Sequence, residues 1–173
     1  MDISFNVSDG YCAIEPTKQL CEKYIALKPL VIIMKAFLRQ KGLNDTHIGG
    51  IGSFLLLVLV TAFLQYTIKE NQEKNITLGK LLLELLSFYG KNFNYRKLGI
   101  SIVGDGMLFN KPCFNDSLTV ENPQDPDVDI GKSVRDFDNI AKEFITARDL
   151  LKQNGMSLAS IIKSIPTKKF HTN

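Results

Sequence analysis

The chain has 173 residues, of which 45% are hydrophobic and 23% are charged, a balance typical of a folded globular domain that excludes a wholly disordered protein. Its net charge of +3 is too small to identify a nucleic-acid-binding protein. Its cysteines, Cys12, Cys21 and Cys113, form no CxxC pair, so neither a disulfide framework nor a zinc site is indicated, and reduced intracellular thiols are expected. The two histidines, His47 and His171, are too far apart in sequence to suggest a metal site.

The first predicted element is a β-strand at residues 2–7, where polar and apolar side chains alternate and β-branched residues are present. Turn-forming residues at 8–10 end it, and a short helix is predicted at 16–24. A single strand cannot satisfy the hydrogen-bonding groups along its two edges. We therefore expect this strand to pair either with a part of the protein outside this sequence or with the weaker strands predicted later in the chain.

A longer helix is predicted at 29–41, because Pro29 suits the first turn of a helix and Gly42 suits its end. Its apolar residues recur at helical spacing and indicate one buried face. Lys35 and Arg39 lie four residues apart on the flank of that face, so two positive charges point the same way. From spacing alone, the ordinary interpretation of such a pair is a solvated surface.

The glycine-rich segment Gly49–Ser53 leads into the most apolar part of the chain, Phe54–Leu64. A glycine turn before a helix can present backbone N–H groups to a phosphate, or it can allow two helices to pack closely, and the spacing supports both alternatives equally. The apolar run is shorter than the roughly 20 residues that a membrane span needs, so a central buried helix is predicted. The N-terminus shows no signal-peptide pattern. A small membrane protein is thus the least favoured interpretation.

A polar loop is predicted at 69–75, and Thr77 is predicted to cap a core helix over 78–89 that ends at Gly90. The β-forming residues 93–103, the turn Gly104-Asp-Gly106 and the apolar residues after it predict a small hairpin.

Residues 121–132 are predicted to be a loop, because two prolines oppose both a helix and a central strand. Asp125, Asp127 and Asp129 alternate there as in a calcium-binding loop, but the sixth and twelfth positions of that pattern hold Ile130 and Asp136 in place of glycine and glutamate. A calcium site is therefore not predicted.

The last predicted elements are an amphipathic helix at 133–151, a short helix at 157–165 and a basic tail. No internal repeat is present. The predicted fold is thus mainly α with a small β element.

Read together, four segments resemble the non-canonical poly(A) polymerases, also called the DNA polymerase sigma type, of the DNA polymerase beta-like nucleotidyltransferase superfamily. These segments are Asp2-Ile-Ser-Phe-Asn, Gly49–Ser53 with the apolar helix through Gln65, Tyr89–Ile100 and Glu121–Ser133. The resemblance runs from Asp2 to about Leu151. It implies that residues 11–165 form the helical central, or PAP-associated, domain, with a nucleotide recognition loop at 121–133. It also implies that residues 1–10 are one strand of the α/β catalytic domain, and 166–173 form a basic tail.

The resemblance implies an enzyme that transfers adenylate from ATP to an RNA 3′ end, using two metal ions, Mg²⁺ or Mn²⁺, held by three carboxylates. Asp2 aligns with the third of these carboxylates, and the other two belong to a region that this sequence does not contain. We therefore expect the 173-residue chain alone to lack polymerase activity. Nuclear localisation, a role in RNA surveillance and decay, and partnership with RNA-binding zinc-knuckle and helicase subunits are implied in the same way, with no membrane association.

For the nucleotide site, the resemblance implies that Lys35 and Arg39 face the ATP phosphates and that Ser53, in the turn containing Gly50, contacts the phosphates or ribose. Phe54 takes the place of the tyrosine that relatives put against the base, which keeps the stacking surface but loses the hydroxyl.

The loop at 121–133 is implied to recognise the base, and Glu121, Val128 and Asp129 are its expected contact residues. Val128 replaces the asparagine usual in the family, so the choice between adenine and uracil stays open and a terminal uridylyltransferase is an alternative. The other alternative is a non-catalytic helical module that binds protein partners.

Overall fold

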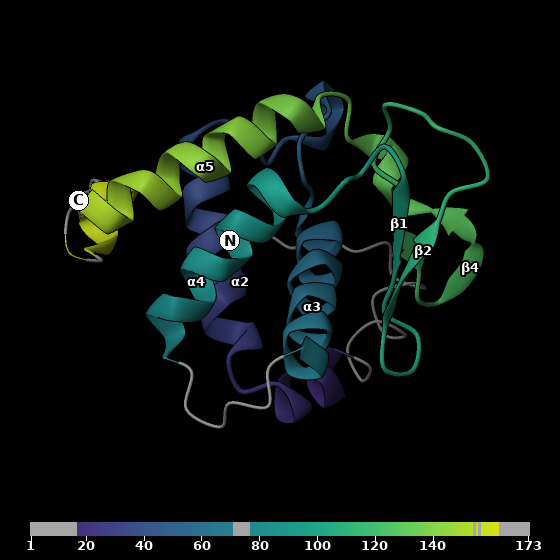
Figure 1. Ribbon diagram of the computed structural model, residues 1–173, viewed down its shortest axis with the longest axis horizontal. Coiled ribbons are helices and arrows are strands. Elements are labelled where there is room, and N and C mark those ends of the chain that lie inside the picture. Colours follow the sequence, from purple (N-terminus) through teal and green to yellow (C-terminus); the bar gives the residue numbers. More distant parts are fainter. Residues whose placement is uncertain (1–16, 71–76, 154, 156, 163–173) are drawn as a thin grey trace, which may run out of the picture.

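The computed structural model describes residues 17–70, 77–153, 155 and 157–162. The described part is mostly helical with two short antiparallel β pairs, so the predicted mainly-α fold with a small β element is confirmed. Helix α3 lies at the centre, with α2 and α4 on one side, the strands on the other, and α5 across one end (Figure 1). The predicted strand at 2–7 and the basic tail at 166–173 fall outside the described residues.

Helix α2 spans Leu27–Gln40 and confirms the helix predicted at 29–41, although it begins two residues earlier. Pro29 lies in its first turn, as predicted, where a missing backbone N–H costs no helical hydrogen bond. The buried face of α2 consists of apolar residues at helical spacing, namely Leu27, Leu30, Met34, Phe37 and Leu38. This face packs against α3.

Helix α3 spans Ser53–Glu70, and its apolar run is buried nearly all round, which confirms the predicted central helix. No helix in the described ranges is both long and apolar enough to cross a bilayer. The helix continues to Glu70, so the polar loop predicted to start at residue 69 begins too early. The rest of that predicted loop, 71–76, lies outside the described residues.

Helix α4 spans Leu78–Ser87 and is capped as predicted, because the Thr77 hydroxyl accepts a hydrogen bond from the Lys80 N–H (3.3 Å). The prediction that Gly90 ends the helix is wrong. The chain continues in a π-helical turn, Phe88–Asn92, that contains this glycine. A Cβ at Gly90 would lie 2.7 Å from Ile145 Cδ1, so the glycine allows close packing against α5.

The predicted hairpin is confirmed: β1 (Leu98–Ser101) pairs antiparallel with β2 (Met107–Asn110). Gly104 and Gly106 in the connecting turn have φ angles of 64° and 73°, a conformation that favours glycine. Gln65 of α3 anchors this turn, because its Nε2 donates to the carbonyls of Ile102 (3.2 Å) and Gly104 (3.3 Å). The hairpin is thereby fixed to the central helix.

The segment predicted to be a loop at 121–132 forms a second, smaller hairpin, and the prediction is wrong in this respect. Strand β3 (Glu121–Asn122) pairs antiparallel with β4 (Asp125–Asp129). The prolines are compatible with this pairing because the sheet has only two strands. Each strand therefore has one edge that forms no ladder hydrogen bonds, and a proline can lie there. A bulge interrupts the register next to Asn122.

Helix α5 spans Phe137–Gln153 and not the predicted 133–151. It starts four residues later because Ile130–Ser133 forms a 3₁₀ turn, and the Asp136 carboxylate accepts from the Asn139 N–H (3.0 Å) at the helix entry. Where a helix was predicted at 157–165, the described part is a 3₁₀ turn at Leu158–Ser160. A further 3₁₀ turn, Thr46–Ile48, precedes α3.

Candidate functional site

Three of the segments that carry the predicted site residues are joined by backbone hydrogen bonds near the start of α3. The Leu43 N–H, just after α2, donates to Leu38 O (2.8 Å), and the Ile51 N–H in the glycine turn donates to Leu43 O (2.8 Å). The Arg135 N–H, just after the 3₁₀ turn that follows β4, donates to Gly49 O (3.2 Å). The end of α2, the glycine turn and the segment that follows the β3–β4 pair therefore meet.

The glycine turn allows this close backbone approach. Gly49 has a φ of 90°, and a Cβ there would lie 2.6 Å from Arg135 Cγ. Gly50 is buried, and a Cβ on it would lie 2.5 Å from Leu43 O. These contacts favour the packing alternative for both glycines. The turn nevertheless leaves Ser53 exposed at the first position of α3, where backbone N–H groups and the helix dipole favour an anion.

Lys35 and Arg39 lie one turn apart on α2, as predicted. Lys35 is half-buried and Arg39 is exposed. In the described part of the chain neither forms an ion pair, whereas Lys41 next to them binds Glu143 (2.8 Å). Helix α2, which leads into the glycine turn, thus carries two cations without an acidic partner among the residues that the structure describes.

Phe54, the residue after Ser53, is half-buried and packs against the hydrophobic core. Its aromatic ring is therefore held by core contacts and is still partly accessible.

The Asp129 carboxylate organises the β3–β4 hairpin from within. Its Oδ1 accepts from the backbone N–H groups of Val120 (2.9 Å) and Gly131 (2.8 Å). The neighbouring Val128 side chain is 44% exposed, and Glu121 stands opposite Asp129 in the strand pairing. The sequence did not predict that Asp129 bridges the N–H groups of Val120 and Gly131. An aspartate two residues before a glycine is a turn signal, and it could have indicated the contact with Gly131.

No metal site can be assembled from the residues that the structure describes, since no group of three or more histidine, cysteine or carboxylate side chains converges there. Asp2, the predicted metal ligand, lies outside those residues. The described donors therefore do not fit a two-metal centre, and no chemical step through a metal is derived from them.

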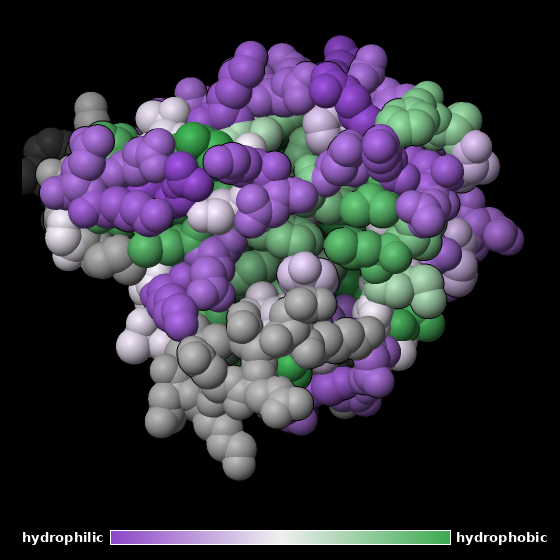
Figure 2. Space-filling model, viewed as in Figure 1, coloured by the Kyte–Doolittle hydropathy of each residue, from purple (hydrophilic) through white to green (hydrophobic). Residues whose placement is uncertain are grey.

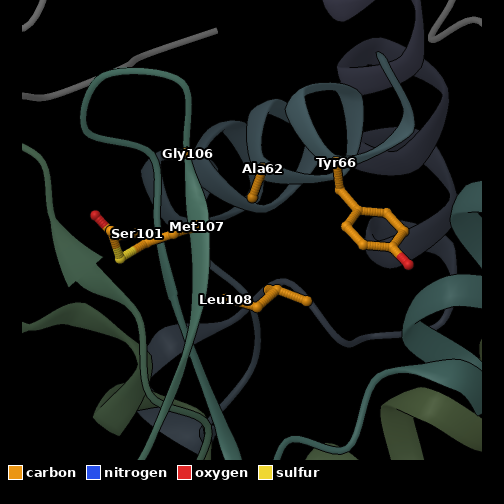
Figure 3. A pocket seen from close by; sticks show the side chains of 6 residues that line it. All are labelled: Ala62, Tyr66, Ser101, Gly106, Met107 and Leu108. Carbon is orange, nitrogen blue, oxygen red and sulfur yellow. The ribbon is translucent and has the colours of Figure 1, made fainter. Parts of the chain in front are cut away.

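A small cavity of about 180 Å³ opens elsewhere, between the C-terminal half of α3 and the β1–β2 hairpin. Figure 3 shows Ala62 and Tyr66 of α3 beside the hairpin residue Leu108, and hydrophobic side chains gather over this region in Figure 2. Ala62 lies nine residues after Ser53, or about 14 Å along the helix axis, so the cavity is distinct from the candidate site.

Tyr89 and Arg96 link elements around these regions, and the buried Tyr95 lies next to Arg96. The Tyr89 hydroxyl donates to Leu59 O (2.7 Å), and burial raises the pKa of Tyr89 well above its ordinary value. Burial, helped by Asp138, raises the pKa of Tyr95 to about 12.

Arg96 contacts Asp138 through Nη2 (2.7 Å). Its Nε contacts Asp116 (2.7 Å), so this side chain links α5 to the segment after β2.

Comparison with known proteins gives results consistent with this geometry. Residues 77–128 match the family model described as "Cid1 family poly A polymerase". The chain is 36% identical to poly(A) RNA polymerase cid14 of Schizosaccharomyces pombe over 94% of its own length and 25% of that protein. It is also 32% identical to the inactive poly(A) RNA polymerase protein Trf4-2 of Drosophila melanogaster, over 76% of this chain and 36% of that protein.

Among solved structures, the polymerase core of TRAMP, described as an RNA surveillance complex, matches with a TM-score of 0.70 and 30% identity. That match covers 82% of this chain and 47% of the matched chain. The chain thus spans about a quarter of the length of its curated relative from S. pombe and about half of the solved polymerase chain.

Proposed function

The chain belongs to the non-canonical, Cid1-type poly(A) polymerases, and from this premise we propose that it is the nucleotide-holding part of an enzyme that adds adenylate to RNA 3′ ends. The observation that carries the proposal is the meeting of three segments at the start of α3. Backbone hydrogen bonds join the end of α2, the glycine turn and the segment that follows the β3–β4 hairpin. Helix α2 also carries two cations that pair with no described acidic residue.

Each segment has a role in this proposal. Lys35 and Arg39 bind the β- and γ-phosphates of ATP, and Ser53 together with the first backbone N–H groups of α3 binds the phosphates or ribose. The turn containing Gly50 shapes this region. Phe54 lies against the base.

The β3–β4 hairpin, which we call the recognition hairpin (121–133), reads the edge of the base. Glu121 and Val128 contact the base there, and Asp129 holds the hairpin's backbone in position and approaches the nucleotide from the same strand.

In the reaction, the 3′ hydroxyl of the RNA attacks the α-phosphorus of ATP, a new P–O bond forms, and the bond to the β-phosphate oxygen breaks. Negative charge develops on the departing pyrophosphate. Two cations one helical turn apart stabilise that charge more strongly than the charge on the intact triphosphate, and this difference lowers the barrier. Asp2 is proposed as one ligand of the divalent metal ions, Mg²⁺ or Mn²⁺, that assist this chemistry.

A nuclear location, a role in RNA surveillance and decay, and assembly with RNA-binding zinc-knuckle and helicase subunits are part of the proposal. The similarity to the polymerase core of an RNA surveillance complex supports it.

A second candidate is a helical protein-interaction module without catalysis, because one relative of similar identity is an inactive protein. The two candidates differ in whether the chain binds a nucleotide at the start of α3. A third, uridylyl transfer, differs only in the preferred base.

Calorimetric titration of ATP into the 173-residue chain tests the proposal. We expect Lys35→Ala and Arg39→Ala each to weaken ATP binding about 10-fold, equal to about 1.4 kcal/mol, because each removes a charge-assisted contact to phosphate. Lys142→Ala is the matched control, since Lys142 is an exposed lysine on α5. The proposal is wrong if the chain binds no nucleotide, or if all three variants bind ATP as the unaltered chain does.

A further inference from the structure

Helix α2 carries a stripe of positively charged side chains that is longer than the triphosphate of one nucleotide. The sequence of α2 contains Lys28, Lys35 and Arg39 and no acidic residue. At about 100° per residue, these three cations and Ile32 lie within roughly 60° of one another around the helix. They lie on the side away from the buried face, and Ile32 is 58% exposed. We call these four residues the basic stripe.

The charges of the basic stripe are not neutralised within the part of the molecule that the structure describes. The cations on either side of the stripe in the sequence do have acidic partners: Lys23 approaches Asp105 (3.7 Å) and Lys41 approaches Glu143 (2.8 Å). The three cations of the stripe form no such contact with a described acidic residue. Among the described residues, therefore, the basic stripe carries three positive charges that can attract an anion.

The stability of the helix does not explain Lys28. Arg39 lies in the last turn of α2, where the helix dipole favours a positive charge. Lys28 lies in the first turn, where the same dipole opposes a positive charge and where no acidic side chain offsets it. The exposed Ile32 one turn further along also contributes nothing to the core. Both side chains are therefore available for contact with another molecule.

The spacing of the stripe indicates a second anion besides the nucleotide. Lys35 and Arg39 are separated by one helical turn, about 6 Å along the axis, which suits the phosphates of one triphosphate. Lys28 lies seven residues before Lys35, about 10 Å further along the axis. A triphosphate held between Lys35 and Arg39 does not extend that far, so Lys28 is left for a different anion.

We propose that Lys28 binds a backbone phosphate of the RNA substrate and that Ile32 packs against a ribose or base next to it. This inference rests on the proposed function, which supplies RNA as the second polyanion near a bound nucleotide. A lysine can bind phosphate as a point charge without strict geometry, and an exposed apolar side chain beside it suits a single strand whose bases are unstacked.

Fluorescence anisotropy with a 5′-labelled oligoadenylate of 15 nucleotides tests the proposal on the 173-residue chain. We expect Lys28→Ala to weaken RNA binding about 3- to 5-fold at low salt and Lys28→Glu to weaken it further. The slope of log affinity against log salt concentration should fall by about 0.7 for one lost phosphate contact on a single strand. Lys28→Arg should restore binding, and Lys142→Ala on α5 is the control with one charge removed elsewhere.

ATP titration of the same variants separates this inference from the proposed function. Lys28→Ala should bind ATP as the unaltered chain does, because Lys28 is too far from the triphosphate. The inference is overturned if the unaltered chain binds no RNA, if Lys28→Ala and Lys142→Ala weaken RNA binding equally, or if Lys28→Ala weakens ATP binding as much as Lys35→Ala. If instead Lys35→Ala and Arg39→Ala leave ATP binding intact, the proposed nucleotide site itself is wrong.

Discussion

The backbone N–H of Arg135 donates to the carbonyl oxygen of Gly49 over 3.2 Å. This single bond ties the segment after the recognition hairpin to the turn that begins α3. Gly49 has a φ of 90°, and its missing side chain leaves room for the aliphatic part of Arg135. Contact between the turn and the hairpin segment therefore depends on a glycine at this position.

Gly49→Ala should destabilise the chain by about 2–4 kcal/mol, because the alanine adds a clash with Arg135 to the cost of a left-handed backbone. Gly42→Ala is the control: Gly42 has a φ of 68° and nothing within 4 Å of its missing Cβ. It should cost only about 1 kcal/mol. Urea unfolding measures both, and equal losses for the two variants would show that the contact with Arg135 is unimportant.

Gly90→Ala should destabilise the packing of the π-helical turn against α5 by about 1–3 kcal/mol, because the new Cβ would lie 2.7 Å from Ile145 Cδ1. Ile145→Ala removes the atoms that clash. In the Ile145→Ala background, therefore, Gly90→Ala should cost much less, and a double-mutant cycle of unfolding free energies measures the difference. Additive effects of the two changes would contradict this assignment.

The stability of the chain should decrease from pH 10 to pH 12. Burial raises the pKa of Tyr95 to about 12, so the folded chain keeps this proton after an unfolded tyrosine, with a pKa near 10, has lost it. Below pH 10 both states are protonated and the stabilising effect is fully present. Tyr95→Phe should make the decline of the unfolding free energy across this pH range shallower. Tyr89, whose pKa burial also raises, should account for part of the remainder. An unchanged slope for Tyr95→Phe would contradict the prediction.

Val128→Asn should change the preference between ATP and UTP, because an amide at this exposed position can both donate to and accept from a base edge, whereas valine can do neither. The ratio of the two dissociation constants, measured by calorimetry, should change about 3- to 10-fold, the effect of one base-specific hydrogen bond. Val103→Asn, at an exposed valine just after β1, is the matched control and should leave the ratio unchanged. No change for Val128→Asn would remove this residue from base selection.

The sequence predicted the helices best where a single local signal decides the outcome. The side chain of Thr77 caps α4, and the first turn of α2 contains Pro29, because both effects depend only on backbone geometry within one helical turn. The hairpin around Gly104 was predicted from a local signal too, because its turn has left-handed backbone angles that favour glycine.

The errors arose where a specific side-chain contact, and not a local sequence pattern, sets the structure. Gly90 looked like a helix end, but Ile145, far along the chain, explains the glycine through packing. The prolines at 123 and 126 suggested a loop, yet the Asp129 carboxylate bonds to Val120 and helps the segment close into a hairpin. Such contacts leave no periodic pattern in the sequence.

For the candidate site, the resemblance to the polymerase family indicated which residues to consider. How the segments that carry them lie relative to one another was visible only in the structure. The spacing of Lys35 and Arg39 placed them on one side of a helix. The hydrogen bonds of Leu43, Ile51 and Arg135 then show that this helix, the glycine turn and the segment after the recognition hairpin adjoin. The roles of the individual side chains toward a nucleotide stay predictions for the titrations described above.

Two adjacent side chains of the recognition hairpin, Val128 and Asp129, have different surroundings. Asp129 fixes the backbone through Val120 and Gly131, while the Val128 side chain points outward and takes no part in those bonds. Position 128 can therefore be exchanged without refolding the hairpin around it. If Val128 contacts the base as proposed, a mutation there would change nucleotide preference with little loss of stability. Substrate preference would then diverge between close relatives faster than their fold does.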